Sequence, residues 1–66
     1  MSGRPGPRIR TAEKIAIHGQ WVTVAVTTDD PEHPAYELDM TAEQYVRTVL
    51  LIDERGSAPI PTGVHA

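Results

Sequence analysis

A change of phase in an alternating aliphatic pattern constrains the fold of this chain more than any other feature of its sequence. Ile15 and Ile17 occupy odd positions, whereas Val22, Val24 and Val26 occupy even positions. Side chains alternate between the two faces of a β-strand, so one unbroken strand would place these two groups on opposite faces. The chain must therefore turn or bulge between Ile17 and Val22.

A tight turn at His18-Gly19 restores a single apolar face, because glycine adopts the positive φ that two-residue hairpin loops require. Cross-strand partners share a face, and this turn pairs Ile15 with Val22. All five aliphatic side chains then point the same way. A β-bulge at Gly19-Gln20 within one long strand would also restore the phase. We favour the hairpin and keep the bulge as the alternative.

A third strand is predicted over Ala35–Met40, where the polarity alternates again. Its apolar side contains Tyr36, Leu38 and Met40, and its polar side contains Glu37 and Asp39. A strand with this pattern has one face on a core and one face in water.

A helix is predicted directly after this strand. Thr41 and Gln44 have the spacing of a capping box, in which each side chain accepts a hydrogen bond from the backbone N–H of the other residue. Arg55 and Gly56 suit the last turn and the C-cap. The expected apolar positions of the helix are Ala42, Tyr45, Val46, Val49, Leu50 and either Ile52 or Asp53.

These elements define the fold class as α+β. We expect a small antiparallel β-meander of two to three strands, with one C-terminal α-helix packed on one face. The folded domain should span residues 8–56. Residues 1–7 are rich in Gly and Pro and are predicted to form a disordered basic arm, and residues 57–66 an extended tail.

A chain of this length is expected to need a further source of folding stability, such as a partner. A chain of 66 residues buries only roughly 60% of its unfolded surface, so its own core is marginal. Cysteine is absent, which excludes disulfides and thiolate metal sites as supports. We therefore expect a homo-oligomer or a subunit docked on a larger protein partner. No apolar run approaches the roughly 20 residues of a membrane span, so a cytoplasmic protein without a membrane partner is expected.

An acidic stretch invites a metal or acid/base interpretation. Asp29, Asp30, Glu32 and His33 are bunched together, with Pro31 and Pro34 between and after them. Calcium loops instead space their acidic ligands over about twelve positions, and paired catalytic carboxylates need two different environments. A solvated turn between strands explains the stretch better. We predict no catalytic residue, no metal site and no cofactor, and hence no enzyme.

The chain's single tryptophan is the more informative residue. If the valines face the helix, Trp21 lies on the opposite, uncovered face of the sheet, where tryptophan is a favoured interface anchor. The predicted partner interface comprises Trp21, Thr23, Ala25, Ala16 and Lys14. The alternative is that Trp21 packs against the N-terminal arm or at the sheet edge.

A second function class rests on the N-terminal arginines. Arg4, Arg8 and Arg10 could contact phosphate as an extended arm, as in a small DNA-associated regulator. The net charge of −3 argues against general nucleic-acid binding, because phosphate contacts need Lys and Arg. Our first hypothesis is therefore a non-enzymatic protein–protein interaction module, and the DNA-associated regulator is the alternative.

One family resemblance accompanies the strand pattern. "WVTVAVTTDD", followed by "YELDMT" and a helix, resembles the N-terminal dimerisation domain of the actinobacterial H-NS-like bridging nucleoid proteins. The likeness covers roughly residues 20–50 and rests on Val22, Thr23, Val24, Asp29, Asp30 and the run from Tyr36 to Thr41. It implies dimerisation, or interference with another protein's dimerisation. The strand order and loop lengths differ, and the basic DNA-binding part of that family is missing. The composition, rich in Val, Ala, Arg, Thr and Asp, is typical of a high-GC actinobacterium or its phages.

Overall fold

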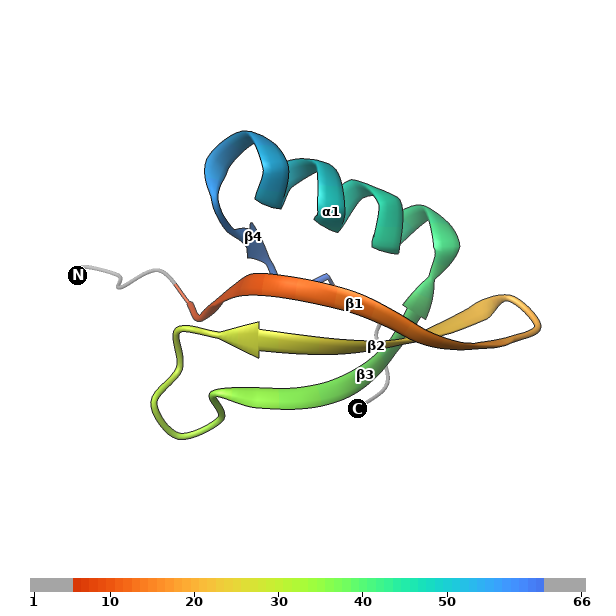
Figure 1. The fold of residues 1–66 in the computed structure, drawn as a ribbon, viewed down its shortest axis with the longest axis horizontal. Coiled ribbons are helices and arrows are strands. Elements are labelled where there is room, and N and C mark those ends of the chain that lie inside the picture. The colour runs from red at the N-terminus through yellow and green to blue at the C-terminus, as the bar shows by residue number, and fades with distance from the viewer. Residues whose placement is uncertain (1–5, 62–66) are drawn as a thin grey trace.

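The fold is a curled antiparallel sheet with one helix on one face (Figure 1). The computed structural model describes residues 6–61. The elements in chain order are β1 (Arg8–His18), β2 (Trp21–Thr28), β3 (Ala35–Thr41), α1 (Ala42–Arg55) and β4 (Ala58–Pro59). The predicted α+β class, the meander and the C-terminal helix are confirmed, and the structure adds a fourth strand.

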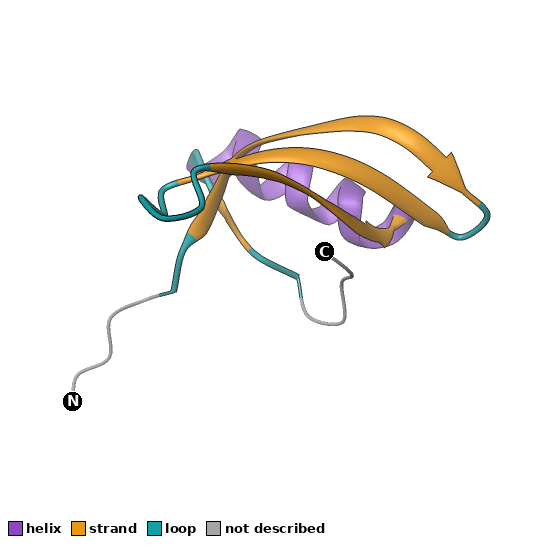
Figure 2. Ribbon diagram, turned by 90° about the horizontal axis from the view of Figure 1, so that it is seen from below, coloured by secondary structure: helices purple, strands orange, loops and turns teal. Residues whose placement is uncertain are grey.

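The strands lie in the order β3-β2-β1-β4, and every neighbouring pair is antiparallel. Figure 2 views the sheet from the side opposite to α1, with the strands in front of the helix. Within the described residues, α1 covers one face of the sheet and no element covers the other. The sheet therefore has an inner face toward α1 and an outer face away from it.

The β1–β2 hairpin is confirmed, but its turn is not the predicted one. The turn residues are Gly19 and Gln20, Gly19 has a φ of 61°, and His18 pairs with Trp21. A positive φ at the first central residue alone is the pattern of a type II′ turn. This turn pairs Ile17 with Val22 and so places Ile17 on the inner face.

A bulge then shifts the register of β1. It lies between Lys14 and Ala16, and it gives Lys14, rather than Ile15, the position opposite Val24. Ile15 is displaced and remains 48% exposed, and Ile17 is 62% exposed near the hairpin tip. The expectation that both isoleucines pack beside the valines is therefore wrong, and so is the expected pairing of Ile15 with Val22. The bulge is real, but it lies in β1 rather than at Gly19-Gln20.

The predicted third strand and helix caps are confirmed. Leu38 and Met40 of β3 are buried on the inner face. The Thr41 side chain accepts a hydrogen bond from the backbone N–H of Gln44 (3.2 Å), and the Gln44 side chain accepts one from the backbone N–H of Thr41 (2.9 Å). Gly56 ends α1 in the left-handed conformation, and its N–H donates to the Ile52 carbonyl over 2.7 Å.

The rotation of α1 about its axis differs from the expected one. Thr48 is buried against the sheet, and Tyr45 and Ile52 pack against the core on either side of it. Val46 and Leu50 lie two residues from Thr48 along the chain, which is about 160° away around a helix. They therefore face outward together with Val49, although they were expected on the buried side.

The predicted C-terminal tail begins with a strand. Ala58 pairs with Ile9 and is fully buried, and Ile60 packs against the core. The Arg8 guanidinium holds this segment, since its Nε donates to the Ser57 hydroxyl over 2.8 Å and its Nη2 to the Ser57 carbonyl over 3.2 Å. The folded part thus extends past Gly56, because the chain after the helix closes the core beside β1.

The core lies between the inner face of the sheet and α1. Its buried apolar residues among those described are Ile9, Val22, Val24, Val26, Leu38, Met40 and Ala58. Each valine, leucine, isoleucine or methionine here contributes roughly 1.5–3 kcal/mol on burial. Tyr36 and Tyr45, which were expected in the core, are half-buried against it. The buried part of the core is therefore built mainly from small and medium side chains.

Candidate functional site

The acidic stretch forms a compact loop between β2 and β3. The Thr28 N–H donates to the Pro34 carbonyl over 2.9 Å, and the Thr28 hydroxyl donates to the His33 carbonyl over 2.6 Å. The Asp30 carboxylate accepts a hydrogen bond from the Glu32 N–H (2.9 Å) and lies 3.5 Å from His33 Nδ1. A carboxylate that bonds to the backbone two residues onward is a turn-forming device. Asp30 therefore shapes the loop.

Asp29 ties the loop to the start of β1. Its Oδ1 accepts a hydrogen bond from the Arg8 N–H over 2.8 Å, and its own N–H donates to the Arg8 carbonyl over 3.2 Å. Two acidic side chains of the stretch thus bond to backbone N–H groups of the fold itself. This geometry accords with the interpretation of the stretch as a turn between strands.

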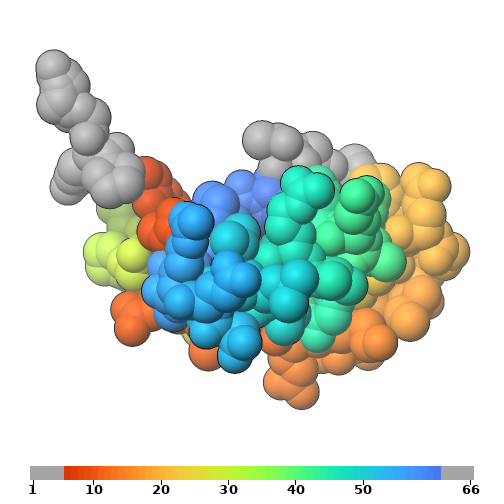
Figure 3. All heavy atoms as spheres, turned by 90° about the horizontal axis from the view of Figure 1, so that it is seen from above, coloured from red at the N-terminus to blue at the C-terminus, as the bar shows by residue number. Residues whose placement is uncertain are grey.

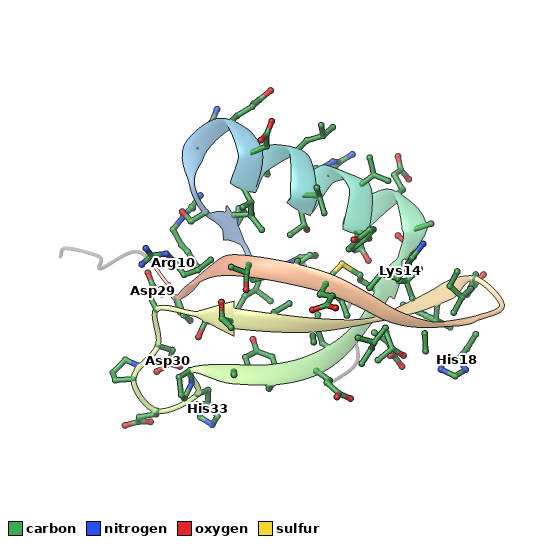
Figure 4. All side chains as sticks on the ribbon, in the orientation of Figure 1. Arg10, Lys14, His18, Asp29, Asp30 and His33 are labelled. Carbon is green, nitrogen blue, oxygen red and sulfur yellow. The ribbon has the colours of Figure 1, made fainter. Side chains whose placement is uncertain are left out.

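The histidines of β1 and of the loop lie at opposite ends of the molecule. Figure 4 shows His18 at the hairpin tip, far from Asp29, Asp30 and His33 at the other end of the sheet. Within residues 6–61, no three side chains of the His, Cys, Asp and Glu types gather closely enough to hold a metal ion.

The outer face of the sheet carries most of the predicted partner interface. Trp21, Thr23, Ala25 and Ala16 lie on it and are half-buried. Lys14 does not, because its register partner is Val24, whose side chain is in the core. Figure 4 shows the Lys14 side chain on the side of the sheet that faces α1. The bulge before Ala16 is the reason for the difference.

The outer face is polar and acidic apart from its tryptophan and alanines. The Thr23 hydroxyl donates to Asp39 Oδ1 over 2.6 Å, and the hydroxyls of Thr11 and Thr27 are joined by a 2.6 Å hydrogen bond. Glu13 and Glu37 are the register partners of Ala25 on either side, so carboxylates flank the middle of the face. Charged residues are depleted at the cores of protein interfaces. The outer face is thus a poor apolar docking surface.

Large exposed aliphatic side chains gather on other elements. They are Ile15 and Ile17 of β1, and Val46, Val49 and Leu50 of α1, with Val46 and Leu50 each more than half exposed. We call Val46, Val49 and Leu50 the outer surface of α1. Figure 3 looks down on α1 and shows no other described element lying over it. The sequence contained a signal for this surface, because α1 has more apolar residues than one side of a helix can bury.

The three arginines of the alternative hypothesis are not equivalent. Arg4 lies outside the described residues. The Arg8 side chain is bound to Ser57, as described above, so it belongs to the fold. Arg10 is exposed, and Figure 4 shows it at the same end of the molecule as Asp29. Within the described part of the chain, Arg8 and Arg10 belong to a strand and not to an extended arm.

An open hollow of about 550 Å³ lies beside the acidic loop. Its lining residues are Pro7, Asp30, His33, Tyr36, Glu37 and Ile60. No side-chain nitrogen or oxygen buried in the described structure lacks a hydrogen-bond partner, so no unsatisfied buried group is directed into the hollow. Nothing in its lining selects a particular ligand.

Comparison with known proteins gives no match: no protein-family model fits the sequence, and no curated protein or solved structure is significantly similar to it. The resemblance to the nucleoid-protein dimerisation domain therefore stays a prediction that rests on the strand motif. Among residues 6–61, no helix has the length and apolar character needed to cross a membrane.

Proposed function

We propose that this chain is a small non-enzymatic protein–protein interaction module, which acts as a homodimer or as an accessory or regulatory subunit of a larger protein. The observation that carries the proposal is the outer surface of α1. Val46 and Leu50 are 54% and 55% exposed, while the only buried residue of α1 is Thr48. Exposed aliphatic side chains next to one another, on a domain of marginal size, are typical of an interaction site.

The proposed docking surface is α1 rather than the outer face of the sheet. Trp21 is half-buried, and the side chains around it include hydroxyls and carboxylates that already bond to one another. The outer surface of α1, by contrast, offers three aliphatic side chains whose removal from water favours association. The uncovered sheet face remains the second candidate surface because it carries the chain's tryptophan.

Two matched substitutions distinguish these surfaces. Leu50→Glu places a charge on the outer surface of α1, and His18→Glu places one on the outer face of the sheet, opposite Trp21. Both positions are exposed, so both variants should keep the wild-type circular dichroism spectrum. The immobilised chain, incubated with extract of its native host, should retain a specific protein that is lost with Leu50→Glu and kept with His18→Glu.

Two results would count against the proposal. If a retained protein binds Leu50→Glu as well as the wild type and is lost with His18→Glu, the site is the outer face of the sheet. If the wild type retains nothing and also shows no self-association, it is not an interaction module of this kind.

A further inference from the structure

The charges that flank Leu50 form a pattern suited to a second copy of the same chain. Arg47, Leu50 and Glu54 are spaced three and four residues apart, so they follow one another along one side of α1. All three side chains are exposed. A cation, an aliphatic side chain and an anion therefore succeed each other, with the aliphatic residue in the middle.

We propose that two copies associate through α1, with the helices antiparallel and a two-fold axis near Leu50. This arrangement deepens the proposed function by naming the partner as a second copy of the chain. It places Leu50 beside the partner's Leu50, and Arg47 beside the partner's Glu54. The two-fold axis makes the same charge pair twice, which is what a self-complementary interface requires.

The charges select this register and direction over the others. A parallel pair would put Arg47 beside the partner's Arg47 and Glu54 beside the partner's Glu54. An antiparallel pair centred closer to the middle of α1 would put Glu43, which is also exposed, beside the partner's Glu54. Like charges brought together across an interface oppose association. The existing ion pair of Arg47 with Glu43, 3.9 Å long and highly exposed, is weak enough to be exchanged.

The free edge of β1 is a less suitable place for a second copy. β4 pairs only with Arg8 and Ile9, so the remainder of β1 has no strand on that side among the described residues. That edge has two register shifts, and Lys14 occupies a position on the inner face. Bulges and inward-placed lysines are the features with which proteins prevent edge-to-edge pairing.

The interface should be weak. A helix of 14 residues is about 21 Å long, so one helix face covers well under the roughly 800 Å² that each partner buries in a typical stable complex. We expect a dissociation constant of micromolar order or higher. Sedimentation equilibrium over about a hundredfold range of protein concentration measures such an association.

Charge exchange tests the arrangement. In the proposed dimer, Arg47→Glu brings a glutamate beside the partner's Glu54, and Glu54→Arg brings an arginine beside the partner's Arg47. Because each variant alone makes like-charge contacts, it should dimerise about tenfold more weakly than the wild type. An equimolar mixture of the two variants restores both opposite-charge pairs, as does the double variant. Both should recover wild-type association. Glu43→Arg lies outside the proposed contact but removes the weak ion pair with Arg47, so it should change the dissociation constant by no more than about twofold.

The outcomes separate this arrangement from the broader proposal. A wild-type protein that is monomeric throughout the concentration range overturns the dimer. The broader proposal still holds in that case if a host protein binds the wild type and does not bind Leu50→Glu. Single variants that dimerise like the wild type, or a mixture that fails to recover, exclude the Arg47–Glu54 contact. Dimerisation of Glu43→Arg that is about tenfold stronger than that of the wild type, well beyond the loss of its ion pair with Arg47, would place the axis closer to the middle of α1. Circular dichroism confirms that each variant keeps its helix.

Discussion

Gly19 determines how the hairpin closes, since it is the first residue of the two-residue turn between β1 and β2. Its φ of 61° lies in a region that residues with a side chain avoid, and a Cβ built at this position would meet nothing within 4 Å. The requirement for glycine is therefore conformational and not steric. Gln20, the other turn residue, has no positive φ and does not require glycine.

Gly19→Ala should consequently destabilise the protein by about 1–2 kcal/mol, the cost of holding an L-residue in a left-handed region. Gln20→Ala is the matched control and should change the free energy of unfolding by less than about 0.5 kcal/mol. Urea denaturation followed by tryptophan fluorescence measures both values. Equal effects of the two substitutions would show that the turn lies elsewhere.

The element that sequence patterns describe least well is β4. Ala58–Pro59 follows the C-cap Gly56 closely and is too short to show alternation, yet Ala58 is fully buried beside Ile9. Its position is fixed by tertiary contacts: Ala58 and Pro59 pair with Ile9 and Arg8, and the Arg8 guanidinium donates two hydrogen bonds to the adjacent Ser57. Short pairings of this kind stabilise a core without leaving a local signature.

Ala58→Asp tests whether this segment belongs to the fold. Burying an unpaired carboxylate in the core should cost at least about 2 kcal/mol. Pro59→Asp alters the neighbouring exposed position and should cost less than about 0.5 kcal/mol. Thermal or urea unfolding of both variants gives the difference. If Ala58→Asp were as stable as the wild type, residues after Gly56 would be a tail, as their composition predicts.

The predictability of the other elements depends on whether local chemistry fixes them. The caps at Thr41 and Gly56 follow from side-chain and backbone chemistry within one turn, so the sequence located α1 correctly. The rotation of α1 depends on which of several apolar residues the sheet accepts, and here it buries Thr48 and exposes Leu50. The register shift between Lys14 and Ala16 likewise depends on how β1 pairs with β2. Alternation along β2 is a local pattern, so the sequence placed Trp21 on the correct face of the sheet. The outer surface of α1 depends on the rotation of the helix, so the sequence missed it.

At the scale of the whole molecule, the large aliphatic side chains of the described residues are divided between the core and the surface. The buried core holds three valines and one residue each of isoleucine, leucine, methionine and alanine, while Ile17, Val46 and Leu50 are each more than half exposed. The exposed aliphatic side chains of α1 and β1 thus form apolar surface that residues 6–61 of one copy leave in water. A second copy or a larger partner would supply it, because association removes such surface from water.

If two copies associate through α1, stability must depend on protein concentration. Unfolding of a dimer releases two chains, so each tenfold increase in concentration adds about 1.4 kcal/mol per dimer to the free energy of unfolding. With an unfolding entropy near 2.1 cal/mol/K for each of the 66 residues, this raises the melting temperature by about 5 °C per tenfold step where the dimer dominates. Leu50→Glu should make the melting temperature independent of concentration, whereas His18→Glu should keep the dependence. Differential scanning calorimetry at several protein concentrations measures this dependence. If the wild-type melting temperature stays constant over the concentrations at which sedimentation detects dimers, the dimer contributes nothing to stability.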